Sequence, residues 1–293
     1  MDTKIIDVER FWNSHPCQAD LSHEENRRRY FAEISLKRFE GRDRHVPLIA
    51  GFNGFQDRDV LEIGCGIGTD GLEFARHGAR YVGVDLTSNS INLARERFRL
   101  FGTPGRFEVA NAEERLPFAA ASFDHIYSFG VLHHSPVPEK IVKEIHRVLR
   151  TGGTFTIMLY NRASVNYYVE IMLLRKLFRW CLLPSFMPGL IAAMTGFDRW
   201  KLEGHRAILT RRRKFSKAEW INMNTDGPFC PLARVYDRRE AAVLFEAFAN
   251  VRQEIWEFNV DHWPFLRRVI PKRMARWIGR RWGWHRIIYG QRA

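Results

Sequence analysis

Residues 60–70 read Val-Leu-Glu-Ile-Gly-Cys-Gly-Ile-Gly-Thr-Asp, and this stretch decides the fold. It predicts a short buried strand that runs into three glycines and then into the start of a helix. Glycines at this spacing let the chain turn sharply and let a ligand approach the backbone N–H groups. The next apolar run, residues 81–84, ends at Asp85, which is where an α/β sheet places a carboxylate for ribose hydroxyls.

The spacing of the glycines distinguishes between classes of ligand. A dinucleotide-binding loop has the pattern G-x-G-x-x-G, in which the glycines make room for a pyrophosphate. Here the third glycine falls one residue early, at Gly68, and position 69 is Thr. Glu62 adds a negative charge before the loop, which suits a cationic, amino-acid-bearing ligand better than a pyrophosphate. The alternative, that the glycines serve only a strand-turn-helix, stays open at this point.

The composition is that of a globular protein, because 45% of the 293 residues are hydrophobic and can form a core. The four cysteines are scattered with no C-x-x-C pair, so neither a disulfide framework nor a metal site is expected, and a reducing cytosol fits. The N-terminus carries Asp2 and Asp7 and no apolar run, so no signal peptide is expected. The most apolar stretch, residues 171–194, contains basic residues and prolines that argue against a membrane span.

Positive charge is concentrated in two parts of the chain. The net charge is +13, yet residues 162–236 hold 13 Lys/Arg against 5 Asp/Glu, and residues 262–293 hold 9 Lys/Arg and no acid. The rest of the chain is therefore mildly acidic. Such an asymmetry indicates a polyanionic partner, which leaves membrane phospholipid, a phosphorylated substrate and nucleic acid as candidates.

Strand and helix patterns alternate over the first part of the chain. Strands are expected at residues 59–63, 81–84, 106–110, 123–129 and 154–160, and helices at 70–77, 88–101 and 139–149. Asp70 and Glu73 have the spacing of a capping box at the start of the first of these helices. The alternation predicts an α/β fold, with a doubly wound, mostly parallel sheet.

The pattern divides the chain into four segments. Residues 1–57 are expected to form a helical cover, 58–160 the ligand-binding core, and 161–235, which lack the alternation, an inserted substrate lid. Residues 236–293 resume it with a helix at 237–248 and strands at 251–260 and 285–290. The last two strands follow each other, with a basic amphipathic insertion at 261–284 between them, so they are expected to be antiparallel.

Five ordered strings carry a resemblance to a known family. They are residues 61–68, 83–85, 110–118, 122–124, and 130–134 followed by 147–153. Over residues 60–160 the chain resembles the class I S-adenosylmethionine-dependent methyltransferases. It is most similar to the small-molecule branch that contains the ubiquinone/menaquinone C-methyltransferases and the methyltransferase type 11 domain. The resemblance implies a seven-stranded Rossmann-like methyltransferase fold with S-adenosyl-L-methionine as cofactor.

The resemblance also implies roles by position. The methionine part of the cofactor would face Glu62 and the loop residues Gly64, Cys65, Gly66 and Gly68. Asp85 would accept hydrogen bonds from both ribose hydroxyls, and Leu86 would pack on the adenine. The adenine edge would lie along Asn111, Ala112 and Glu113, and Phe129 would line the cofactor near the methyl group. The family usually has Asp where Asn111 stands, which implies weaker selectivity there.

Methyl transfer from a sulfonium is an in-line displacement, so a base is needed only if the acceptor must lose a proton. The candidates are His133 and His134 after the fourth strand, and Tyr160 at the end of the fifth, because ligands bind at that edge of the sheet. The alternative is that the histidine pair caps the following helix or bonds a loop. Residues 224–228 form either a polar substrate loop or, by preference, a simple turn.

Residues 167–194 and 263–284 combine aromatic and aliphatic side chains with Lys and Arg. This is typical of interfacial amphipathic helices, and equally of a lid that packs on its own core. We therefore expect a cytoplasmic methyltransferase acting on a small-molecule or lipid-linked acceptor, with contact to an anionic membrane surface at the inner membrane face. Two alternatives stay open. One is an RNA methyltransferase, although the sequence lacks an Asn-Pro-Pro-Tyr-type motif and an RNA-binding module. The other is a non-catalytic membrane-surface binding protein with this fold.

Overall fold

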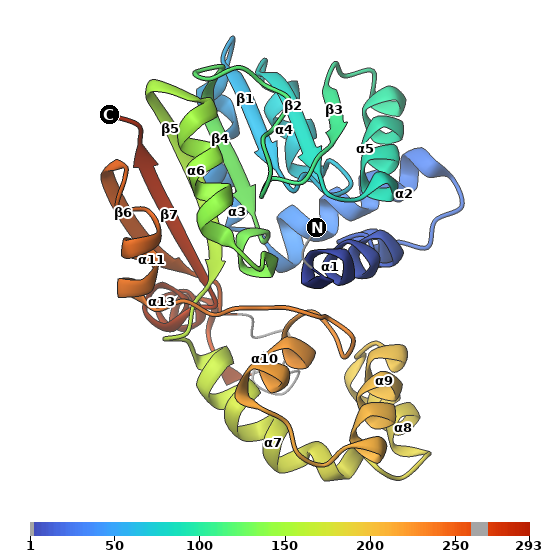
Figure 1. Ribbon diagram of the computed structural model, residues 1–293. Coiled ribbons are helices and arrows are strands. Elements are labelled where there is room, and N and C mark those ends of the chain that lie inside the picture. The colour runs from blue at the N-terminus through green and yellow to red at the C-terminus, as the bar shows by residue number, and fades with distance from the viewer. Residues whose placement is uncertain (1–2, 259–268) are drawn as a thin grey trace.

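The computed structural model describes residues 3–258 and 269–293, and over these residues its centre is one seven-stranded sheet (Figure 1). The strands are β1 (Asp59–Ile63), β2 (Arg80–Asp85), β3 (Arg106–Val109), β4 (Phe123–Phe129), β5 (Leu149–Tyr160), β6 (Ala249–Trp256) and β7 (His285–Gln291).

The strands lie in the order β3-β2-β1-β4-β5-β7-β6. The first five are parallel, and β7 runs antiparallel to both β5 and β6. The predicted doubly wound, mostly parallel sheet with an antiparallel last pair is confirmed. Because the chain order reverses between β1 and β4, the carboxyl ends of these two strands form the crevice in which such sheets bind ligands.

Helices cover both faces of the sheet, and Figure 1 shows α6 in front of it and α4 behind. One apolar cluster joins the sheet to α3 (Val46–Ala50), α4 (Thr69–Arg76) and α5 (Ser88–Phe101). A second cluster joins the other face to α6 (Pro138–Val148) and α11 (Arg238–Leu244). The expected end of α5 is confirmed, because Gly102 takes the left-handed conformation that terminates a helix.

The predicted capping box at the start of α4 is wrong. Gly68, in the left-handed conformation, is the N-cap, and no side chain caps the helix. Asp70 is buried instead, and its two carboxylate oxygens accept hydrogen bonds from Arg38 at 2.5 and 2.6 Å. This carboxylate makes a tertiary ion pair with a residue 32 positions earlier, which the local spacing of Asp70 and Glu73 does not reveal.

The N-terminal segment is helical and lies against the glycine loop. It comprises α1 (Thr3–Ser14), α2 (Arg27–Leu36) and α3, with the short helices η1 (Ala19–Leu21), η2 (Lys37–Arg42) and η3 (Phe52–Phe55). Tyr30, Phe31 and Ile34 of α2 form a buried cluster with Ile67 of the loop. The segment therefore covers the loop through apolar packing.

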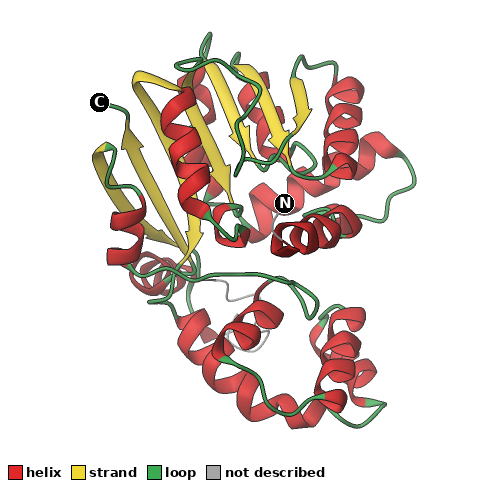
Figure 2. Ribbon diagram, in the orientation of Figure 1, coloured by secondary structure: helices red, strands yellow, loops and turns green. Residues whose placement is uncertain are grey.

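Residues 161–235, which we call the lid, are drawn as helices and connecting loops below the sheet (Figure 2). The helices are η5 (Asn166–Leu174), α7 (Arg175–Phe178), η6 (Arg179–Leu182), α8 (Met187–Thr195), α9 (Arg199–Arg211) and α10 (Lys217–Thr225). Ile171, Leu209, Trp220 and Met223 form a small buried cluster of their own, and the Trp220 indole donates to the Ile171 carbonyl at 2.8 Å. The lid thus has its own apolar core.

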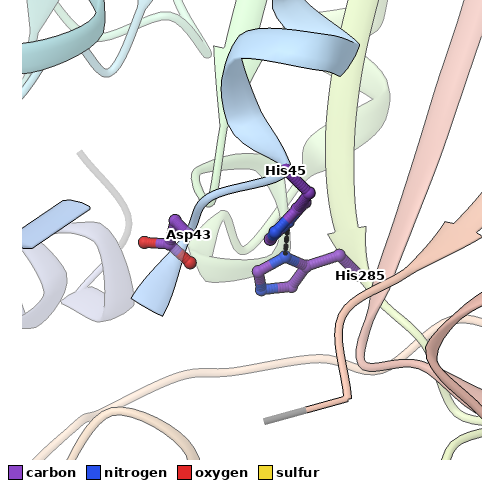
Figure 3. Close-up of side chains that lie close together, drawn as sticks. All are labelled: Asp43, His45 and His285. Atoms are coloured by element: carbon purple, nitrogen blue, oxygen red, sulfur yellow. Dashed lines mark hydrogen bonds between the residues drawn. The ribbon is translucent and has the colours of Figure 1, made fainter. Parts of the chain in front are cut away.

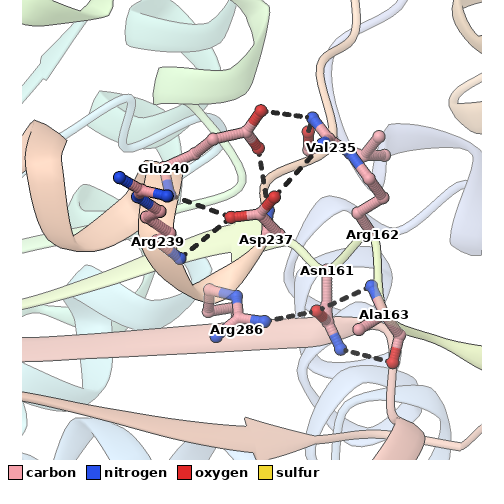
Figure 4. Close-up of polar contacts among 8 residues, drawn as sticks. All are labelled: Asn161, Arg162, Ala163, Val235, Asp237, Arg239, Glu240 and Arg286. Atoms are coloured by element: carbon pink, nitrogen blue, oxygen red, sulfur yellow. Dashed lines mark hydrogen bonds and ion pairs between the residues drawn. The ribbon is translucent and has the colours of Figure 1, made fainter.

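The two ends of the lid are joined at one place beside the sheet (Figure 4). Asn161, which is fully buried, pairs with Tyr236 through an isolated bridge and accepts a hydrogen bond from Arg286 of β7 at 2.6 Å. Arg162 pairs with Glu240 of α11 at 2.7 Å. These contacts attach the start and the end of the lid to the sheet and to α11, so the lid has a defined origin at the carboxyl edge.

The C-terminal part differs from the prediction in its details. β6 ends at Trp256, earlier than the expected end at residue 260, and residues 259–268 of the basic insertion lie outside the described residues. The insertion continues as α13 (Lys272–Trp282), which buries Ala275 and Gly279 against the chain near β6. Among the described residues, no helix is both long enough and apolar enough to cross a bilayer.

Candidate functional site

The glycine loop after β1 forms one wall of a large cavity. Gly64, Gly66 and Gly68 all have positive φ, between 51° and 72°. A Cβ on Gly64 would lie 2.1 Å from the Val131 side chain, whereas a Cβ on Gly66 would meet nothing within 4 Å. Gly64 is therefore needed for close packing, and Gly66 leaves space at the point where a ligand can approach the backbone.

Asp85, at the end of β2, holds this loop in place. Its Oδ2 accepts from the Gly66 N–H at 2.9 Å, and its Oδ1 accepts from the Thr87 N–H and hydroxyl at 2.9 and 2.8 Å. Burial raises the pKa of Asp85, although the bonds from Thr87 and Gly66 act in the opposite direction. Asp85 thus accepts three hydrogen bonds, and a carboxylate has about four acceptor positions, so one more bond fits. If two ribose hydroxyls both donate to Asp85, Thr87 must release one of its two bonds.

Most of the residues expected at the cofactor site line the same cavity. They are Glu62, Gly64, Cys65, Gly66, Asp85, Leu86, Asn111, Ala112, Glu113 and Phe129. Gly68 is not among the lining residues; a Cβ there would lie 3.2 Å from Ala94 and Phe98, so this glycine lets α4 approach α5. The side-chain oxygen Oδ1 of Asn111 accepts from the Glu113 N–H at 3.0 Å, and the Glu113 carboxylate accepts from the Val137 N–H at 3.2 Å.

Beneath the loop lies a buried group of charges. Glu62 is 3% exposed and accepts a hydrogen bond from the Tyr81 hydroxyl. Burial, together with the charge of Asp70, raises the pKa of Glu62 well above its usual range. Arg38, which pairs with Asp70, also lies over the Phe129 ring, 4.9 Å from its centroid. A cationic ligand next to Glu62 would favour the ionised carboxylate and so would release a proton on binding.

The candidate base residues do not share one environment. His134 and Tyr160 line the cavity, but His133 is fully buried and is not among the lining residues. His133 stacks on Tyr160 with ring centroids 3.7 Å apart. Burial, with smaller contributions from His134 and His285, lowers the pKa of His133 well below its usual value. His133 is therefore a neutral packing residue in this structure.

His134 forms a polar group with Tyr160 and with Asp226, which follows α10 in the lid. The Tyr160 hydroxyl donates to Asp226 Oδ1 at 2.8 Å, and Asp226 Oδ2 lies 3.5 Å from His134 Nε2. His134 Nδ1 lies 2.6 Å from the carbonyl of Leu232. Because a carbonyl can only accept, Nδ1 carries a proton, and a neutral His134 directs the basic nitrogen Nε2 towards Asp226.

The cavity continues from the glycine loop into the lid. Its volume is about 1280 Å³, above the range of roughly 300–1,000 Å³ that is usual for the pocket of one small ligand. Leu174, Phe178, Leu182, Met187, Ile191 and Leu209 line the lid part. His205 also lines it, and burial lowers its pKa to about 3, so it is neutral there. The arrangement offers a polar end at the sheet and an apolar chamber in the lid.

Sequence reasoning missed several residues that line this cavity. Asp226 falls in the stretch 224–228, for which the sequence favours a simple turn, and only the fold brings it to His134. Trp12 of α1 packs on the His134 ring with centroids 5.0 Å apart. Arg38 lies in a helical run without a motif. No pattern in the sequence joins these positions, because each comes from a different segment of the chain.

Residues 61–157 match the methyltransferase domain family. The sterol 4-C-methyltransferase of Caenorhabditis elegans is 36% identical over 109 residues, which are 37% of this chain and 32% of that protein. The ubiquinone biosynthesis O-methyltransferase of Colwellia psychrerythraea is 24% identical over 151 residues, 50% of this chain and 61% of that protein.

Among solved structures, the magnesium protoporphyrin IX methyltransferase of Synechocystis, which was crystallised with S-adenosylhomocysteine, superposes with a TM-score of 0.56. The alignment covers all of both chains at 12% sequence identity, which establishes the fold alone. Residues 61–157 belong to the class I S-adenosylmethionine-dependent methyltransferases, in the methyltransferase type 11 domain family. The chain spans less than two thirds of the two curated relatives described above.

We expect Asp85→Asn to weaken S-adenosylmethionine binding at least about tenfold, because the amide cannot replace charge-assisted bonds worth roughly 1.5–3 kcal/mol each. Isothermal titration calorimetry measures the change. Glu139→Gln, the same chemical change at an exposed position in α6, is the matched control and should bind as the unaltered protein does. Equal affinities in the two variants would show that the cofactor does not use Asp85.

Proposed function

We propose that this chain is an S-adenosylmethionine-dependent methyltransferase whose acceptor is a largely apolar small molecule or a lipid-linked molecule. The observation that carries the proposal is the single cavity that joins the glycine loop to the apolar chamber of the lid. The cofactor part has the open space at Gly66 and the carboxylates of Glu62 and Asp85. The methylation of sterols and of quinone precursors, named for the relatives, is consistent with an apolar acceptor.

The residues around the cavity have distinct parts in this reaction. The cofactor, when bound, supplies a methyl group activated by its sulfonium, so alignment and exclusion of water provide much of the rate. The glycine loop and Asp85 hold the cofactor, and the lid and α1 enclose the acceptor. His134 Nε2 takes the proton if the acceptor is a hydroxyl or an acidic carbon, and the nearby Asp226 carboxylate stabilises the resulting imidazolium. Tyr160 orients Asp226 through its hydrogen bond.

The proposal is tested by supplying the full chain with methyl-labelled S-adenosylmethionine and separate extracts of lipids, polar metabolites and RNA. We expect label in organic-soluble molecules, since the lid part of the cavity is apolar, and loss of that label with Asp85→Asn. Label found only in RNA would contradict the proposed acceptor class. A complete lack of incorporation, with cofactor binding intact, would contradict the proposed activity.

If a proton must be removed, His134→Ala should lower the rate of methyl transfer about a hundredfold or more, since general bases contribute roughly 10²–10⁴-fold. Asp226→Asn should also lower the rate, because the imidazolium that forms on His134 loses its neighbouring carboxylate. Cofactor affinity should not change. Asp7→Asn, at an exposed position in α1, is the control. Unchanged rates in Asp226→Asn and His134→Ala would mean that transfer proceeds by alignment alone.

We further propose that α13 contacts an anionic membrane surface and so brings the lid cavity close to lipid-linked acceptors. Ala275 and Gly279 face the protein, while Trp277 and Trp282 are 57% and 43% exposed, with their ring centroids 5.4 Å apart. Five basic residues surround them: Lys272, Arg273, Arg276, Arg280 and Arg281. Exposed tryptophans among basic residues are favoured at a lipid interface.

Replacing Lys272, Arg273 and Arg276 together with Gln should abolish sedimentation with anionic vesicles, because each basic residue contributes on the order of 1 kcal/mol near such a surface. Binding of the unaltered chain should weaken at high salt, and neutral vesicles should not bind it. The matched control replaces Arg211, Arg213 and Lys214, three exposed basic residues of the lid, with Gln. An equal loss in both variants would exclude a specific contact by α13.

A further inference from the structure

Two histidines and a carboxylate from distant segments meet at the edge of the cavity (Figure 3). Asp43 and His45 lie in the turn between η2 and α3, and His285 begins β7. His45 Nε2 is 2.8 Å from His285 Nδ1, and one ligand atom from each of the three residues lies within 4.8 Å of the others. Asp43 and His285 line the cavity, and His45 is buried behind them.

We propose that Asp43, His45 and His285 bind one divalent transition-metal ion, with its remaining coordination positions directed to an anionic oxygen of a ligand in the cavity. Two imidazoles and one carboxylate are donors that suit ions such as zinc, iron(II) or cobalt(II) better than magnesium or calcium, which prefer oxygen ligands alone. The sequence does not predict such a site. Its cysteines form no metal-binding pair, and the two histidines are 240 residues apart along the chain.

The surroundings of His45 are those of a metal-binding imidazole. Its Nδ1 lies 3.1 Å from the Glu257 carboxylate, on the side opposite to His285. The two atoms lie within ion-pair distance but make no hydrogen bond in this orientation of the side chains. A carboxylate beside one ring nitrogen is usual for metal-bound histidines, because it orients the ring and leaves the other nitrogen, here Nε2, as the ligand atom. The Trp256 ring stacks on His45 with an interplanar angle of 19°, which restricts its rotation.

The distances require only a small adjustment. Two nitrogens bound to one tetrahedral zinc ion lie roughly 3.3 Å apart, given Zn–N distances of about 2.0–2.1 Å. The pair in this structure is 2.8 Å apart, so an ion replaces the shared proton when the rings separate by about 0.5 Å. The Asp43 carboxylate pairs with Arg38 at 2.9 Å, and the same guanidinium also pairs with Asp70, so two carboxylates share one cation.

Titration of the full chain with zinc alone tests this site and does not depend on the proposed methyl transfer. We expect one zinc per chain by calorimetry, binding at least about tenfold weaker in His45→Ala and in His285→Ala, and about ten- to a hundredfold weaker in Glu257→Gln. Cobalt(II) should give a d–d absorption spectrum that these variants lose, and magnesium should not compete. Circular dichroism of Glu257→Gln, the mildest change, shows whether the fold is retained.

The second cluster of possible ligands supplies the matched control. His134, Asp226 and Cys230 also lie close enough together to hold an ion. His134→Ala should leave the zinc stoichiometry and the cobalt spectrum unchanged. The proposal is overturned if the unaltered chain binds no stoichiometric zinc, or if binding follows His134 and is independent of His45 and His285.

Discussion

The buried ion pair between Arg38 and Asp70 is the interaction on which the rest of the site depends. Both residues are 4% exposed, and the guanidinium meets the carboxylate through two hydrogen bonds. Burial alone would lower the pKa of Arg38, but Asp70 and Asp43 raise it well above its usual value. Removing one partner of such a pair typically costs about 3–5 kcal/mol, because the other charge is left buried without compensation.

This pair connects three parts of the molecule. Arg38 comes from the N-terminal cover, Asp70 from the first turn of α4 after the glycine loop, and Phe129, beneath the guanidinium, from the end of β4. The cover therefore cannot move away from the loop without exposing or separating buried charges. The same guanidinium pairs with Asp43 and so positions the turn that carries His45. One ion pair thus places the loop, the wall of the cavity and the histidine cluster relative to each other.

Much of the sheet could be predicted because its signals are local. Residues 88–101 show helical periodicity and end at a glycine, and the helix has those bounds. Asp85 follows an apolar strand, and it lies beside the glycine loop. The predicted capping box failed because its side chain takes a distant partner. Asp70 has the spacing of a capping residue but pairs with Arg38, and His133 and His134 are neighbours in sequence, yet only His134 reaches the cavity.

The sequence by itself determined the sheet, the glycine loop and the class of domain, because backbone conformation and alternating apolar patterns depend on residues that are close along the chain. Only the tertiary structure decided which side chains share the cavity. Asp226 reaches His134 from 92 positions away and His285 reaches His45 from 240, since the lid and the last strand both return to the carboxyl edge of the sheet. Contacts at that separation depend on how whole helices and strands pack together. No local pattern of residues predicts that packing.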